Sequence, residues 1–354
     1  MHPSSYRSLW LLLLAAIGIA SSQVTLMGGK GQLRLFDAEN SLPGQLYLNG
    51  VYSLFLEKHD HVSIAANGAK EISSVLVKDN AFNLSMTLGI SKTLEIFIHT
   101  VPYQDNQKDL WGPIGDAQCG LKLHLAKEGA LLQTGVAGYI GLPTAPRHTI
   151  PFEPFAKDAY SWSLVGLMNL DIRNTRTAIP LKCTFNIGYR DNDWHDRYFV
   201  DEIDQLLAGA GFKFSLRAYQ FYSEVTSEVF INKSGMTLRQ NSIRYSQGVR
   251  FIGLQNFIFD IAADLKIGGY RPTAEQIQEN PLLKRYADWK ILLGASYRLT
   301  FFTQLTPEEK KAKALQAEEK RKMDEIRKKR EKVAEEMEEL KKNVDKEKQE
   351  KQPF

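Results

Sequence analysis

The chain has 354 residues, with 45 basic and 41 acidic side chains and a formal net charge of +4. Because the two signs nearly cancel, the composition gives no sign of a nucleic-acid-binding protein, which needs a strongly basic surface. Two cysteines, Cys119 and Cys183, are too few for a disulfide-stabilised scaffold, and we expect both to be free thiols.

Residues 1–22 have the pattern of a secretory signal peptide. Arg7 precedes an apolar run from Leu9 to Ile19, and small residues follow it. The run has only about half of the roughly 20 residues that a membrane-spanning helix requires. No later stretch reaches 18 apolar residues, so we expect an exported chain that either stays in solution or crosses a membrane as strands.

From residue 44 to 302 apolar and polar residues alternate with a period of two, which predicts β-strands. Phe82 and Leu84, for example, alternate with Asn83 and Ser85. We expect about twelve strands, at roughly 44–57, 79–91, 93–102, 115–126, 130–142, 158–173, 177–190, 205–217, 219–231, 241–252, 256–268 and 288–302.

Two features favour a membrane barrel over a soluble sandwich. Many predicted strands have about ten residues or more, as a tilted strand needs to cross a bilayer, whereas soluble strands usually have about 5–6. Long and short connections alternate, as in barrels with long extracellular loops on one rim and tight periplasmic turns on the other. The sequence therefore predicts an all-β fold, a transmembrane up-and-down antiparallel β-barrel of about twelve strands over 44–302.

The last predicted strand carries Gly294, Tyr297, Leu299 and Phe301, with Arg298 on the opposite face. A charge on the lipid face at mid-depth costs about 2–4 kcal/mol, so Arg298 should face the lumen. The pattern Gly-x-x-aromatic-x-apolar-x-Phe resembles the terminal strand of bacterial outer-membrane proteins. This resemblance implies that the outer-membrane assembly machinery reads Gly294, Tyr297, Leu299 and Phe301 as an assembly signal.

Both ends of the predicted barrel resemble a widespread class of uncharacterised outer-membrane barrels. DWKILLGASY (288–297) is similar to their closing strand, and GGKGQLRLFDAENSLPGQLYLNG (28–50) to the segment that leads into it. Many members continue into an OmpA-like peptidoglycan-binding domain, whereas this chain continues into a charged tail. The resemblance implies the bacterial outer membrane, contacts with its lipid and lipopolysaccharide, and a periplasmic segment at 23–43 before the barrel.

The tail, 303–354, is mostly Lys, Arg and Glu, and we expect it to be a charged helix in the periplasm. Thr306 suits an N-cap and Pro307 the first helical position. Two interpretations remain open: a solitary solvated helix, or a coiled coil formed through 306–354 with a second copy or a periplasmic partner. Nucleic acid is not an expected partner, because the charges of the tail nearly cancel.

The predicted inner faces carry many charges, which are tolerated inside a barrel only if they are paired or hydrated. A narrow pore and a plugged, salt-bridged lumen both fit this pattern, and the mixed signs argue against strong ion selectivity. The lumen-lining candidates are Lys122, Lys182, Lys213, Arg217, Glu224, Arg244, Arg250, Asp260, Asp264 and Arg298.

Three functions are compatible with these residues. The first is a narrow passive channel or transporter for small solutes, and the second is a structural barrel that anchors the helical tail as an envelope tether. The third is a lipid hydrolase at the rim, but neither His99 nor His124 lies in a catalytic motif. We therefore expect a protein that is not an enzyme, with no catalytic residues, cofactor or metal site.

Overall fold

The computed structural model describes residues 24–64, 70–105, 109–111, 117–126, 129–144, 160–175, 179–194, 204–216, 218–232, 237–252, 256–268 and 287–301. The chain divides into two units, Met1–Phe302 and Thr303–Phe354, and every described residue belongs to the first. The predicted signal peptide and the predicted helical tail lie outside the described residues.

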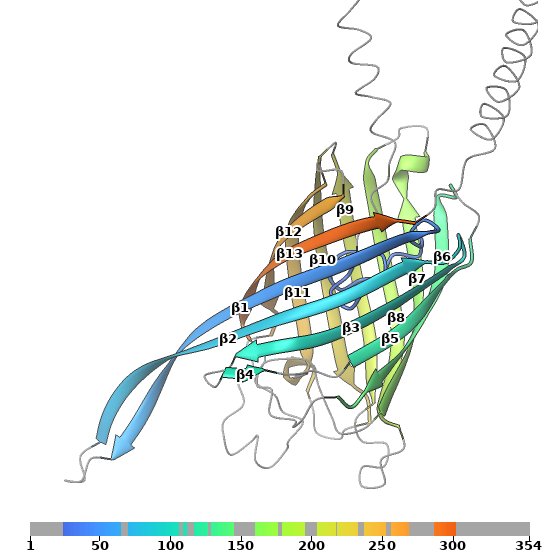
Figure 1. Ribbon diagram of the computed structural model, residues 1–354. Helices are drawn as coiled ribbons and strands as arrows, with labels where there is room; N and C mark the ends of the chain where they lie inside the picture. The colour runs from blue at the N-terminus through green and yellow to red at the C-terminus, as the bar shows by residue number, and fades with distance from the viewer. Residues whose placement is uncertain are drawn as a thin grey trace, which may run out of the picture. The chain divides into compact units, whose positions relative to one another are not determined.

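The described part of the chain is an antiparallel sheet (Figure 1). Two short 3-10 helices, η2 (Ile172–Asn174) and η3 (Leu238–Gln240), lie in connections between strands. No helix among the described residues is long and apolar enough to cross a membrane. The strands are β1 (Gln45–Ile64), β2 (Lys70–Gly89), β3 (Leu94–Asp105), β4 (Asp109–Trp111), β5 (Ala117–His124), β6 (Leu132–Leu142), β7 (Tyr160–Asp171), β8 (Leu181–Trp194), β9 (Gln205–Ser215), β10 (Tyr219–Phe230), β11 (Ser242–Phe251), β12 (Phe257–Lys266) and β13 (Trp289–Thr300).

The sheet closes on itself. Strand β1 pairs with β13 on one side and β2 on the other, and β2 also pairs with β3. Twelve of the described strands therefore form a closed barrel, while β4 is a short addition to the edge of β3. This confirms the predicted antiparallel barrel of about twelve strands.

The hairpin of β1 and β2 is longer than predicted. Its pairing runs without interruption from Leu46 opposite Leu88 to Ile64 opposite Lys70, and Figure 1 shows it projecting beyond the other strands. The predicted strands end at 57 and resume at 79, whereas the observed pairing also includes 58–64 and 70–78. A ladder is held by backbone hydrogen bonds between the strands, and these need no apolar–polar alternation.

The outer face of the barrel is apolar. Along each strand, exposed apolar side chains alternate with buried ones, as the period of two predicted. The exposed fraction reaches 54% at Leu164, 65% at Ile187 and 61% at Ile261. Cys119 and Cys183 are free thiols, as expected. A band of exposed apolar side chains that follows successive strands is the surface that a hydrocarbon environment requires.

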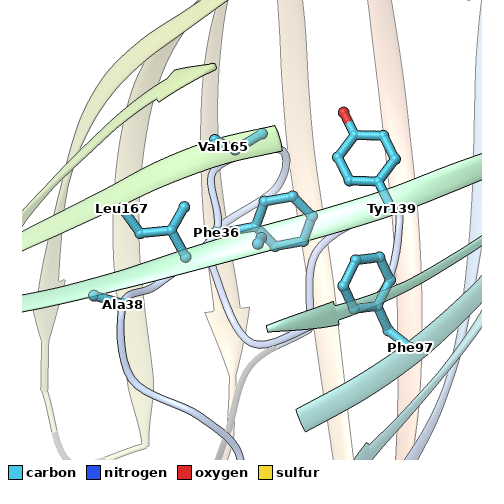
Figure 2. Packing of buried hydrophobic residues seen from close by; sticks show 7 residues of the cluster. Phe36, Ala38, Phe97, Tyr139, Val165 and Leu167 are labelled. Atoms are coloured by element: carbon cyan, nitrogen blue, oxygen red, sulfur yellow. The ribbon is translucent and has the colours of Figure 1, made fainter. Parts of the chain in front are cut away.

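The interior is filled by a segment that precedes β1. Residues 24–41, here called the plug segment, lie inside the barrel (Figure 1) and include Asp37 and Phe36, which are 1% and 3% exposed. Figure 2 shows Phe36 against Phe97 of β3 and Tyr139 of β6, at ring-centroid distances of 5.3 and 6.3 Å. The sequence suggested a periplasmic segment at 23–43. The structure instead places it in the lumen, because twelve strands enclose more space than their own side chains fill.

Two glycines of the wall make room for the plug segment. A β-carbon on Gly89 would lie 2.3 Å from the carbonyl oxygen of Leu42, where the segment turns into β1. A β-carbon on Gly209 would lie 2.4 Å from Cδ2 of Leu35. Both distances are far below van der Waals contact, so the wall fits the segment closely only because these positions lack a side chain.

Candidate functional site

The candidate site is the lumen, and two buried ion pairs meet at Asp37 of the plug segment. Lys182 Nζ lies 2.8 Å from Asp37 Oδ1, and Lys213 Nζ lies 2.8 Å from Asp37 Oδ2. Asn169 Nδ2 also donates a hydrogen bond to Oδ1. Burial raises the pKa of Asp37, but the ammonium groups of Lys182 and Lys213 outweigh burial and hold the pKa well below its usual range. Asp37 is therefore ionised.

A second carboxylate of the plug segment, Glu39, extends this network. Its Oε2 lies 2.9 Å from Lys182 Nζ and 3.0 Å from Lys30 Nζ. Gln133 Nε2 of β6 donates to the other oxygen, Oε1, at 2.6 Å. The Glu39 side chain is 27% exposed, whereas that of Asp37 is 1% exposed, so water screens the Glu39 pairs more strongly.

Glu95 of β3 and Lys122 of β5 hold the backbone of the plug segment. Glu95 accepts hydrogen bonds from the backbone N–H groups of Lys30, at 2.8 Å, and Ser41, at 2.5 Å. Lys122 Nζ donates to the carbonyl oxygens of Lys30 and Glu39 and forms a 3.0 Å ion pair with Glu95. This cross-strand pair of the wall is neutral without help from the plug segment.

On the opposite side of the lumen the charges are reversed. Arg34 of the plug segment forms a 2.6 Å ion pair with Asp264 of β12, which also binds Arg244 of β11 at 2.9 Å. Glu224 of β10 accepts hydrogen bonds from the backbone N–H groups of Arg34 and Leu35. Here the wall supplies carboxylates and the plug segment supplies donors.

Arg250 of β11 joins the wall to the plug segment through carbonyl groups. Its guanidinium donates to the carbonyl oxygens of Gly31 and Gln32, both at 3.3 Å, and forms a 2.6 Å ion pair with Asp260 of β12. Tyr222 Oη donates to the other carboxylate oxygen of Asp260 at 2.9 Å. Arg250 thus has a carboxylate partner on the wall and uses its remaining donors on the segment.

Asn186 of β8 binds both backbone groups of one residue, as an opposed residue does in an antiparallel strand pair. Its Oδ1 accepts from the backbone N–H of Phe36 at 2.8 Å, and its Nδ2 donates to the carbonyl oxygen of Phe36 at 3.0 Å. His124 Nδ1 lies 2.9 Å from the carbonyl oxygen of Ala38. Such side chains satisfy backbone groups of the segment that its own turns leave unpaired.

A cavity of about 80 Å³ remains between the plug segment and the wall. Leu26, Leu35 and Phe36 of the segment line it, together with side chains of β6 to β10 that include Tyr139 and Arg190. These wall residues lie farther from the rim of short turns than the ion pairs of Asp37 do.

Most of the predicted lumen-lining residues meet at the plug segment. Lys122, Lys182, Lys213, Glu224, Arg250 and Asp264 contact it directly. Arg244 and Asp260 contact it through Asp264 and Arg250. Arg298 is half-buried on the inner face of β13, and Arg217 lies outside the described residues.

The predicted assembly signal lies on β13 and the residue after it. Phe301 is 64% exposed, and Tyr297 and Leu299 are partly exposed, so these three side chains are on the outer face. Gly294 is on the inner face, where a β-carbon would lie 3.1 Å from Cβ of Asp260.

Sequence reasoning missed the residues of the plug segment that complete the site, above all Arg34, Asp37 and Glu39. One signal could have identified them. The predicted inner faces carry more basic than acidic residues, and a closed interior needs carboxylates from elsewhere to balance the excess. RLFDAE (34–39) is the charged stretch nearest the start of the barrel.

No group of three or more His, Cys, Asp or Glu side chains in the described residues is arranged to hold a metal ion. His99 Nε2 lies 3.2 Å from Asn83 Oδ1, and His124 Nδ1 lies 2.9 Å from the carbonyl oxygen of Ala38.

This geometry defines a class: a closed antiparallel barrel with an apolar exterior and a lumen filled by its own N-terminal segment. No protein-family model matches the chain, and no curated protein matches it. Among solved structures, the chain is similar to the COG4313 outer membrane channel from Pseudomonas putida F1, with 10% identity, a TM-score of 0.51, and coverage of 76% of this chain and 100% of that chain.

Two further solved structures are more distant. The NanC porin has 10% identity and a TM-score of 0.44, with 72% of this chain and 100% of that chain covered. The KdgM porin has 6% identity and a TM-score of 0.38, with 70% of this chain and 98% of that chain covered. At such low identity the first similarity supports the barrel fold alone.

Proposed function

We propose that this protein is a bacterial outer-membrane β-barrel and a narrow passive channel for small solutes, closed at rest by the plug segment. One observation carries the proposal. The side chains of the wall leave a bore wide enough for a stretch of polypeptide, and the plug segment occupies that bore through polar contacts. A bore that holds a peptide also admits a small solute once the peptide has left it.

The outer face supports a membrane location. Lipid offers no partner for backbone polar groups, so a sheet that spans it must be closed, as this one is. Ile187→Lys places a charge where the side chain is 65% exposed on the apolar band. We expect this variant to lose about 2–4 kcal/mol of unfolding free energy in phospholipid vesicles. Ile187→Val is the matched control and should unfold like the native protein.

A reversible crosslink can test whether the plug segment closes the pore. A β-carbon on residue 209 would almost touch the side chain of Leu35, so cysteines at both positions lie within reach of a disulfide. The full-length chain would carry Leu35→Cys and Gly209→Cys, with Cys119→Ala and Cys183→Ala to remove the native thiols. We expect discrete open steps in planar bilayers after reduction and silence after oxidation.

The parent without the two new cysteines is the control, and its conductance should not respond to oxidant. Equal conductance of the crosslinked and reduced forms would refute closure by the plug segment. Asp37→Ala removes the main ion pairs of the segment. If neither this variant nor the reduced form shows any conductance, the channel function itself is refuted.

The second candidate function is a structural barrel that anchors the tail 303–354 in the periplasm. The filled lumen favours it, since an anchor needs no open path. Deleting 306–354 separates the two functions. An anchor predicts loss of envelope integrity with no change in solute uptake, whereas a channel predicts unchanged conductance of the truncated barrel.

The remaining partners are part of the same proposal. Lipid and lipopolysaccharide would surround the apolar band, and the assembly machinery would read Gly294, Tyr297, Leu299 and Phe301. The outward position of Phe301, at 64% exposure, supports a role in recognition. Phe301→Ala should reduce the amount of folded barrel in outer-membrane fractions, and an unchanged amount would remove Phe301 from the signal.

A further inference from the structure

Three side chains on adjacent strands surround one carboxylate inside the barrel: Asn169 of β7, Lys182 of β8 and Lys213 of β9. We propose that they form a binding site for the carboxylate of a small organic acid that passes through the lumen, and that Asp37 of the plug segment occupies this site at rest. The inference rests on the proposed channel function and names its class of solute.

The geometry is that of a carboxylate site. Each oxygen of Asp37 lies 2.8 Å from a different ammonium nitrogen, and Asn169 Nδ2 donates to Oδ1 as well. With the plug segment in place, Asn169, Lys182 and Lys213 are 0%, 1% and 4% exposed, so all three donors face the interior of the barrel. A carboxylate on another molecule would find the same donors in place.

The pairing of the wall gives a second, independent reason. Lys182 and Lys213 stand directly opposite each other in the β8–β9 register, and both side chains are buried on the inner face. Like charges in opposed positions destabilise a sheet, and buried charges require a partner. Asp171 of β7 stands opposite Lys182 in the β7–β8 register, but its carboxylate pairs with Arg173, so the anion that bridges the two lysines is Asp37.

Other basic residues of the lumen have a carboxylate partner on the wall itself. Lys122 has Glu95, Arg244 has Asp264, and each pair lies entirely on the wall. The carboxylates within ion-pair distance of Lys182 are Asp37 and Glu39, both from the plug segment. When the segment leaves, Lys182 loses these two partners.

Competition for this site links solute binding to opening. Asp37 and a solute carboxylate cannot occupy the same donors at once, so the solute binds only the state in which Asp37 has withdrawn. A ligand that binds one of two states shifts the equilibrium toward that state. The solute thus favours release of the segment that blocks its own path.

The neighbouring Glu39 narrows the class of solute. Its carboxylate lies 2.9 Å from Lys182 Nζ and 2.6 Å from Gln133 Nε2, next to the position of Asp37. Donors for two neighbouring carboxylates suit a small dicarboxylate better than a monoacid. Succinate is a suitable probe, and succinamide, which has the same skeleton without charge, is its control.

The rate of disulfide formation between Leu35→Cys and Gly209→Cys reports the position of the plug segment without any need for conduction. We expect succinate to slow this crosslink about fivefold, within the usual range of coupling between two sites, and succinamide to leave it unchanged. Adding Lys182→Gln, Lys213→Gln and Asp37→Asn together should abolish the succinate effect. These three changes keep side-chain size and leave no unpaired charge, and a heat-dependent gel shift confirms a folded barrel.

Lys266→Gln is the matched control, because it removes an inner-face lysine of β12 that does not contact Asp37. It should retain the succinate effect. The carboxylate site is refuted if succinate leaves the crosslinking rate unchanged. It is also refuted if succinate slows the crosslink equally in the triple variant. If succinate slows the crosslink but no variant conducts, the site stands and the proposed channel function fails.

Discussion

The two sides of the lumen hold the plug segment by opposite arrangements of charge. On the side of β7 to β9 the wall is basic, and the carboxylates of Asp37 and Glu39 come from the segment. On the side of β10 to β12 the wall has its own pairs, Arg244 with Asp264 and Arg250 with Asp260, and the segment adds Arg34.

The difference shows where release of the segment is costly. On the first side, release leaves opposed lysines without the carboxylate between them. On the second side, Arg244 keeps Asp264 and Arg250 keeps Asp260, so these pairs survive release, while Glu224 loses the backbone N–H donors of Arg34 and Leu35. Buried charges are tolerated only when paired, and on the first side the segment supplies the carboxylates themselves.

The largest effect is expected for Asp37→Ala. It removes the carboxylate between two buried lysines, and breaking a buried pair in this way typically costs about 3–5 kcal/mol. The plug segment should be strongly released, which is measured as a higher open probability in planar bilayers and faster hydrogen exchange of residues 24–41. If Asp37→Ala leaves both the open probability and the hydrogen exchange unchanged, the ion pairs of Asp37 do not hold the segment and the contrast between the two sides is wrong.

Arg34→Ala should have a smaller effect, although its ion pair with Asp264 is short, at 2.6 Å. Asp264 keeps Arg244 and accepts a hydrogen bond from Ser246 Oγ, so no buried carboxylate is left alone. We expect a loss of about 1.5–3 kcal/mol of segment binding, the scale of one hydrogen bond to a charged group. If hydrogen exchange rises more than in Asp37→Ala, the assignment of the two sides is wrong.

Gly89→Ala tests steric fit rather than charge. The added methyl group would lie 2.3 Å from the carbonyl oxygen of Leu42, and crowding of this kind costs about 1–3 kcal/mol. Gly138→Ala is the matched control, because its β-carbon would have no neighbour closer than 3.8 Å. We expect faster exchange at residues 38–43 only in Gly89→Ala, and equal behaviour of the two variants would contradict the close fit.

The smallest effect is expected for Glu39→Gln. Its side chain is 27% exposed, and pairs open to solvent contribute about 1 kcal/mol or less. The amide also keeps an oxygen that can accept the hydrogen bond from Gln133. Open probability should therefore rise only slightly, and a rise as large as that of Asp37→Ala would show that Glu39, and not Asp37, holds the segment.

The sequence was sufficient to predict the barrel because its signal is local and repeated. In β12, Phe257, Phe259 and Ile261 alternate with inward residues, and the observed strand begins within a residue of the predicted one. Alternation also placed Lys182 and Lys213 on the inner face. Each strand must present one apolar side to lipid, and this constraint leaves a period of two that requires no knowledge of its neighbours.

The site could be predicted only in part, because its partners are far apart in the sequence. Asp37 lies 145 and 176 positions from the lysines that it joins. The plug segment has neither a helical nor a strand period, since its backbone is satisfied by irregular turns within the segment and by side chains of the wall.

By itself, the sequence determined the class of fold, the number of strands and the residues of the inner face, because an apolar exterior and a polar interior impose a pattern on every strand. Only the tertiary structure decided that residues 24–41 fill the lumen and that Asp37 neutralises Lys182 and Lys213. The physical reason is that closing twelve strands leaves a polar bore, and what occupies a bore depends on fit and charge across the whole barrel.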